Sequence, residues 1–285
     1  MKKALFCTAI LLIISGCGTS APETQTAAPS EAQPAAQAEA QPASTADRET
    51  IFQVSLLQGL TLGDYYGSVT VKELKEKGDT GIGTFEGVNG ELIALDGEVY
   101  RAKSDGSVEV APDDETIPFS NVTFFDADTT EEISGITNID DLKAYLNGKV
   151  EEFGKNRFYM IRIDGSFKKV SARSELKQEE PYKTLAEALS TDQREFDFDE
   201  TTGTVVGLFC PEYMNDLNAV GWHFHYVSDD KQKGGHVLDL DIDKAEVKWD
   251  STDGFNMALP ETKMFPELDL TKDQSEDIKK VETNE

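Results

Sequence analysis

The three histidines of this 285-residue chain all lie between residues 223 and 236. His223 and His225 are two positions apart in the segment GWHFHY. On a β-strand, side chains at this spacing point to one face and lie roughly 7 Å apart, so both imidazoles can reach one ion. The polar, glycine-ended stretch from residue 228 to 235 suits a hairpin loop, and the returning strand can place His236 beside the pair. The pattern predicts a metal site with His223, His225 and His236 as ligands.

Three imidazole ligands indicate a particular kind of metal site. Structural zinc sites are usually closed by four ligands, often cysteines, whereas catalytic zinc has three protein ligands and one open position. Imidazole nitrogen suits zinc, and copper, iron, cobalt and nickel are chemically acceptable too. We therefore expect one catalytic divalent ion, zinc (Zn2+). The alternative, histidines that bind no metal, fits a single isolated histidine better than this cluster.

The segments that must position these residues have the pattern of strands separated by glycine turns. Asn89-Gly90, Asp96-Gly97 and Asp105-Gly106 separate short runs of alternating polar and apolar residues, which indicates hairpins. Another hairpin is expected to turn at Asp164-Gly165. The expected strands cover residues 81–86, 91–95, 98–103, 107–110, 121–125, 157–163, 166–173, 204–210, 221–226, 235–240 and 245–249. The expected helices cover residues 71–77, 139–147 and 182–189, the first two capped by Thr70 and Asn138.

These elements predict an α/β (α+β) fold with two mixed, largely antiparallel β-sheet subdomains and a few short helices. A charged, turn-like stretch from residue 174 to 183 is expected to separate the two. The N-terminal mixed-sheet subdomain would then span 49–180, and the C-terminal metal-binding subdomain with its acidic tail would span 181–285. Cys210 lies in an apolar run, which favours a buried small hydrophobe over a reactive thiol.

The first fifty residues predict export. Two lysines precede an apolar run of about eleven residues, which is typical of a secretory signal and too short for a membrane span of about twenty. The run ends in Ser15-Gly16-Cys17, which resembles the bacterial lipobox. We expect residues 1–16 to be a lipoprotein signal peptide and Cys17 to carry the lipid; the alternative is ordinary cleavage near Ala21. Residues 18–48 lack large apolar side chains, so 17–48 should be the lipidated Cys and a disordered tether of an extracytoplasmic, membrane-anchored protein.

The charge of the chain excludes some partners. With 54 acidic and 27 basic residues, the formal net charge is −27. Nucleic acids and anionic membrane surfaces both require basic patches, so no nucleic acid is expected and the lipid would be the only membrane contact. A small anionic substrate would need a local cation, which makes an arginine near the metal important.

Several stretches resemble the alpha-acetolactate decarboxylase family. GLFCP at 207–211, NAVGWHFHY at 218–226 and GGHVLD at 234–239 are similar to the zinc-binding half of that family. GDTGIGTF at 78–85 followed by NGELIALDG at 89–97 is similar to its N-terminal signature, as is YMIRIDGSF at 159–167 continuing to Arg173. The resemblance runs from Ile51 to the C-terminus in the same order.

The resemblance implies a zinc-dependent carboxy-lyase that converts 2-acetolactate to acetoin and CO2 in acetoin and butanediol metabolism. The electron pair that CO2 leaves behind would be held in a metal-stabilised enediolate. By position, the resemblance implies that the catalytic residues are Glu91, Arg173, Glu282 and Thr84, around a zinc held by His223, His225 and His236.

The roles of these residues follow from their chemistry. Arg173 would orient the anionic substrate, with Arg162 as a rival for this position. Glu91 or Glu282 would protonate the enediolate, and either could instead touch the metal. Glu282 lies in a glutamate-rich tail, where Glu276 and Glu285 align almost as well.

Two other classes of function remain beside the decarboxylase. A cupin-like metal oxygenase or isomerase also uses His-x-His on a strand, but it requires a glutamate shortly afterwards, and residues 226–230 contain none. A non-enzymatic zinc-binding surface lipoprotein usually carries more histidines than three. The sequence leaves the oligomeric state open, a homodimer included.

Overall fold

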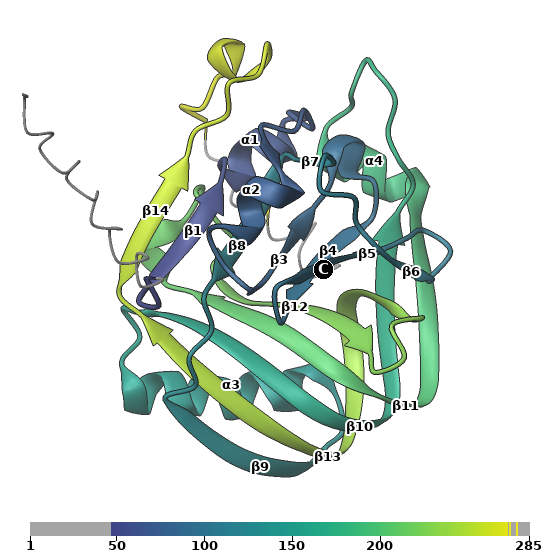
Figure 1. Ribbon diagram of the computed structural model, residues 1–285, viewed down its shortest axis with the longest axis vertical. Coiled ribbons are helices and arrows are strands. Elements are labelled where there is room, and N and C mark those ends of the chain that lie inside the picture. Colours follow the sequence, from purple (N-terminus) through teal and green to yellow (C-terminus); the bar gives the residue numbers. More distant parts are fainter. Residues whose placement is uncertain (1–46, 273, 275–277, 279–285) are drawn as a thin grey trace, which may run out of the picture. The chain divides into compact units, whose positions relative to one another are not determined.

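Two large β-sheets organise the part of the chain that the computed structural model describes, residues 47–272 together with Gln274 and Ile278 (Figure 1). The chain divides into residues 1–44 and residues 45–285, and every described residue belongs to the second unit. The expected signal peptide, the lipidated Cys17, most of the tether and Glu282 lie outside the described residues. No helix in the described ranges combines the length and apolar character that crossing a membrane requires.

The first sheet has seven strands and carries Thr84 and Glu91. All of its neighbouring strands are antiparallel except β1 and β14, which are parallel. In spatial order the strands are β14 (Gly254–Ala258), β1 (Thr50–Val54), β8 (Phe119–Thr123), β3 (Thr80–Thr84), β4 (Glu91–Leu95), β5 (Glu98–Ala102) and β6 (Val108–Val110). A separate ribbon pairs β2 (Val69–Thr70) with β7 (Thr116–Ile117).

The second sheet has five strands and carries Arg173 and the histidines. The strands are β9 (Thr129–Ile136), β10 (Phe158–Glu175), β11 (Gln193–Cys210), β12 (Gly221–Ser228) and β13 (Gly234–Thr252). Strand β10 pairs with both β11 and β13, and all pairs in this sheet are antiparallel. The fold class is therefore as predicted: mixed, largely antiparallel sheets with few helices.

The hairpin predicted at Asp164-Gly165 is wrong, because β10 runs straight through these residues. Gly165 pairs with Gly203 on one side and Ala245 on the other, and its φ lies outside the left-handed region. A Cβ at this position would lie 2.4 Å from the carbonyl oxygen of Lys244. The glycine therefore permits close packing of neighbouring strands rather than a turn.

The sheets do not divide at the expected boundary between residues 180 and 181. Strands β9 and β10 precede that boundary, yet they pair with β11 and β13. The second sheet thus begins at Thr129 in the sequence. The charged stretch 174–183 connects β10 to a helix at the edge of the site instead of separating the sheets.

Helices cover the edges and the outer face of these sheets. They are α1 (Leu57–Thr61), α2 (Val71–Lys75), α3 (Ile139–Phe153) and α4 (Leu185–Asp192), with single 3-10 turns η1 (Glu86–Val88), η2 (Glu212–Met214) and η3 (Phe265–Glu267). Thr70 and Asn138 cap α2 and α3, as predicted, by accepting hydrogen bonds from backbone N–H groups three residues later. Helix α3 lies against the second sheet (Figure 1). Its buried residues Leu142, Leu146 and Val150 belong to the hydrophobic cluster of that sheet.

The opposite face of the second sheet packs on the first sheet. Ile82 and Ile93 from the first sheet share one buried cluster with Met160, Val206 and Leu208 from the second. Burial of this apolar surface stabilises the contact between the sheets, at roughly 25 cal/mol per Å² removed from water. The chemistry-bearing side chains of both sheets therefore meet at one junction.

Candidate functional site

The hairpin of β12 and β13 brings the three histidines together. His225 and His236 are directly paired across the two strands, and His223 lies two residues before His225 on the same face. His236 is also paired with Arg173 on β10. Strand pairing alone therefore places Arg173, His236 and His225 side by side, which confirms the predicted return of His236 to the His223–His225 pair.

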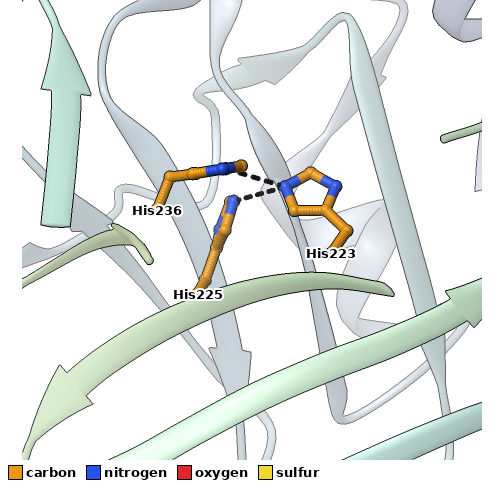
Figure 2. Close-up of side chains that lie close together, drawn as sticks. All are labelled: His223, His225 and His236. Carbon is orange, nitrogen blue, oxygen red and sulfur yellow. Dashed lines mark hydrogen bonds between the residues drawn. The ribbon is translucent and has the colours of Figure 1, made fainter. Parts of the chain in front are cut away.

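The ring nitrogens of these histidines converge on one point, as Figure 2 shows. His223 Nε2 lies 3.0 Å from His225 Nε2 and 3.0 Å from His236 Nδ1. One nitrogen from each ring falls within 4.8 Å of those of the other two. Among the described residues, these histidines are the one group of three or more histidine, cysteine or acidic side chains whose ligand atoms lie close enough together to hold a metal ion.

The imidazole rings are held in the neutral form that can bind a cation. His225 Nδ1 donates a hydrogen bond to the carbonyl oxygen of Leu92 at 2.8 Å, so in the neutral ring Nε2 presents a lone pair to the centre. Burial, followed by the charge of Arg173, lowers the pKa of His223 to about 3, and burial also lowers the pKa of His225. Neutral imidazoles with converging lone pairs fit a divalent metal ion, which resolves their mutual repulsion.

Glu91 enters the site from the first sheet. Its Oε2 lies 3.4 Å from His225 Nε2, and its side chain is buried. Glu91 is the first residue of β4 and pairs with Thr84 on β3. The Thr84 hydroxyl donates to the carbonyl oxygen of Gly90 at 2.8 Å, so it fixes the backbone just before Glu91. Thr84 thus supports the position of Glu91 and also lines the pocket.

Arg173 supplies the local cation. It is 4% exposed, and its Nη1 donates to Gln193 Oε1 on the neighbouring strand at 3.0 Å. Its Nε lies 3.8 Å from Oε1 of Glu175, which is also buried. The rival candidate Arg162 instead forms an ion pair with Asp96 at 2.6 Å and does not line the pocket.

A small pocket joins these groups. Its volume is about 50 Å³. Its lining combines polar side chains with an apolar wall from α1, α4, η1 and the first sheet. The polar lining is Thr84, Glu91, Arg173, Glu175, His223 and His236; the apolar wall is Leu57, Leu60, Val88, Phe119, Leu185 and Leu189. A small anion with alkyl groups matches this division of the pocket.

Sequence reasoning missed two polar residues of the site. Glu175 lies two residues after Arg173, and alternation along a strand puts both on one face, so the Arg-x-Glu spacing was a usable signal. Gln193 pairs with Glu175 from β11, and no local pattern marks it. The predicted Glu282 lies outside the described residues. Cys210 is buried, as predicted, and burial raises the pKa of its thiol.

Known proteins of one kind are similar to this chain. A family model described as alpha-acetolactate decarboxylase matches residues 51–272. The alpha-acetolactate decarboxylase of Methanosarcina mazei is 40% identical over 234 residues, covering 82% of this chain and 80% of that protein. The Bacillus subtilis protein of the same name is 38% identical over 235 residues, covering 82% and 90%. The crystal structure of alpha-acetolactate decarboxylase from Bacillus subtilis strain 168 matches with a TM-score of 0.79 at 37% identity, covering 82% of this chain and 99% of that one.

Proposed function

The chain belongs to the alpha-acetolactate decarboxylase family, and from this premise we propose that it converts 2-acetolactate to acetoin and CO2 with one zinc ion held by His223, His225 and His236. As a member of this family it is a carboxy-lyase that acts on acetolactate. The observation that carries the zinc proposal is the convergence of three ring nitrogens beside a buried arginine and a buried glutamate.

The substrate sets the demands on the pocket. Acetolactate carries a carboxylate, a hydroxyl and an adjacent ketone, and loss of CO2 leaves an electron pair that must move toward the ketone oxygen. When bound, the zinc ion supplies a Lewis acid that stabilises this negative charge. The protein must also orient the carboxylate, exclude water and deliver a proton to carbon.

Arg173 is the residue we assign to the substrate carboxylate. Its guanidinium is buried, permanently charged and able to form paired hydrogen bonds with a carboxylate. The apolar wall from α1 and α4 faces the substrate's methyl groups and keeps water away, which strengthens the attraction between the two charges.

Glu91 is the described residue placed to deliver the proton. Its Oε2 lies within 3.4 Å of a histidine ring nitrogen, so it borders the space where substrate must lie. A protonated carboxyl held at one side of the pocket would add its proton to one face of the planar intermediate and thereby set the handedness of acetoin. Glu282, outside the described residues, is the second candidate that the resemblance provides.

The test of the proposed function is product formation by the purified protein. Fresh acetolactate should yield acetoin and CO2 in equal amounts, well above the spontaneous reaction, and His225→Ala should lose both zinc and activity. A zinc-loaded wild type that gives only the spontaneous rate would favour the alternative of a surface protein that binds zinc without catalysis.

We also propose that the chain is exported and anchored through a lipid on Cys17. The proposal is supported by the basic start, the short apolar run and the lipobox-like ending at residues 15–17. Cys17→Ser should release the protein from membranes or block its processing. Normal cleavage with unchanged membrane retention would contradict the anchor.

A further inference from the structure

Glu175 is a buried carboxylate in the pocket to which the proposed reaction gives no role. It lies on β10 two residues after Arg173, on the same face of the strand, and it lines the cavity together with His223 and His236. It does not belong to the group of side chains that could hold the metal. Burial of a carboxylate is costly unless a partner compensates its charge.

Arg173 is a partner that compensates this charge. Glu175 Oε1 lies 3.8 Å from Arg173 Nε, and both side chains are less than 10% exposed. This distance is too long for a hydrogen bond but close enough for a strong Coulombic attraction in a buried setting. An ion pair on the surface would stabilise the protein little, because solvent weakens the attraction. This pair is buried, so its attraction is weakened less.

Gln193 holds a different edge of the same guanidinium. Its Oε1 accepts from Arg173 Nη1 at 3.0 Å, and its backbone pairs with Glu175 across β10 and β11. The guanidinium is thus held at its Nε edge by a charge and at one terminal nitrogen by a hydrogen bond. Two contacts at separate edges restrict rotation about the long arginine side chain.

We propose that Glu175 is a positioning residue that fixes the Arg173 guanidinium in the orientation in which it meets the substrate carboxylate. The inference rests on the proposed role of Arg173. A fixed guanidinium loses less conformational entropy when substrate binds, so the contribution of Glu175 appears in substrate affinity and acts entirely through Arg173.

A double-mutant cycle tests this dependence on the full-length, zinc-loaded protein. Glu175→Gln keeps the shape of the side chain and removes its charge, and we expect KM for acetolactate to rise about tenfold or more, with kcat changed less than about threefold. Glu175→Asp restores the charge and should recover part of the loss. In the Arg173→Gln background, Glu175→Gln should cause no further rise in KM. Glu246→Gln, which breaks a partly exposed ion pair with Lys248 on the same sheet, is the matched control.

Each result decides between roles. An equal fold-change in KM with and without Arg173 would show that Glu175 acts on its own, and a fall in KM for Glu175→Gln would show that it competes with substrate; either overturns the proposal. If Glu175→Gln alone does not fold, Glu175→Asp takes its place in the same cycle, and a rise in KM that disappears in the Arg173→Gln background still supports the proposal. Inactive wild type would count against the decarboxylase itself, whereas active wild type with unaffected Glu175→Gln would count only against this inference.

Discussion

A single substitution of Glu91 can distinguish between its two possible roles in the site. With Oε2 at 3.4 Å from His225 Nε2, it is near enough to protonate substrate or to touch the metal. If it is the proton donor, Glu91→Gln keeps zinc at one equivalent and lowers kcat by about 100-fold or more, since general acid catalysis contributes that much. Zinc measured by elemental analysis beside acetoin kinetics separates the roles.

A loss of zinc in Glu91→Gln would identify Glu91 as a metal ligand, and unchanged kcat would remove it from the chemistry. Glu98→Gln, at the start of β5 in the same sheet, is the control because Glu98 pairs with Lys75 outside the pocket. Both variants replace a carboxylate by an amide of nearly equal size.

Single residues were predictable where spacing along a strand determined them. His223, His225 and His236 followed from i, i+2 alternation and one hairpin loop. Gln193 could not be predicted in this way, because its place beside Arg173 depends on the register of β10 with β11. That register pairs Gln193 with Glu175, a residue eighteen positions earlier in the chain. Such register is set by long-range packing and leaves no local pattern.

Among the elements, the β12–β13 hairpin bears most directly on the site. Gly235 at its return has a φ of +154°, and a Cβ there would lie 2.5 Å from the carbonyl oxygen of Arg173. We expect Gly235→Ala to move His236 away from its partners, destabilise the fold by about 1–3 kcal/mol and reduce retained zinc. Thermal unfolding and zinc content after dialysis measure both effects.

The matched control for this hairpin change is Gly148→Ala in α3, where a Cβ meets no atom within 4 Å. In a helix interior that change should stabilise by about 0.5–1 kcal/mol and leave zinc unaffected. Full zinc retention and wild-type stability in Gly235→Ala would show that the hairpin does not depend on this glycine.

The same dipeptide gave a correct and an incorrect prediction of elements. Asp96-Gly97 forms the predicted turn, with φ of 54° and 79°, between two short strands that pair with each other. Asp164-Gly165 lies inside an 18-residue strand because both sides of β10 are covered by long partners. Turn chemistry is local, but a strand continues wherever its neighbours satisfy the backbone, and the sequence does not display those neighbours.

At the scale of the whole molecule, acidic side chains crowd the segment where the chain passes from the first sheet to the second. Burial is the main cause that raises the pKa of Asp250 to about 7, and a hydrogen bond from the Asp126 backbone N–H opposes it. The negative charges of Asp128, Glu49 and Asp126 raise this pKa further. The unfolded chain titrates near the ordinary value of 3.8. Between these values the folded protein holds a proton that the unfolded chain has lost, so stability falls as pH rises toward 7.

Asp250→Asn removes this titration. Wild type should lose up to ~4 kcal/mol of stability between pH 4 and pH 8 through this group, because three pKa units correspond to about that much. The variant lacks this loss, so its stability relative to wild type should rise by the same amount. Chemical denaturation at the two pH values measures this difference in stability. Asp199→Asn, at an exposed position, is the control. A gain equal at both pH values would show that the charge of Asp250 is not responsible.

Reconstitution with zinc shows whether the three histidines hold a catalytic metal ion. The full-length protein, stripped by a chelator and dialysed, is titrated with zinc while acetoin formation from fresh acetolactate is followed. We expect the stripped protein to give only the spontaneous rate and activity to rise linearly to a plateau at one zinc per chain, with no recovery in His225→Ala. Full activity in the stripped, metal-free protein, or recovery in His225→Ala, would show that zinc on these histidines is not required for the reaction.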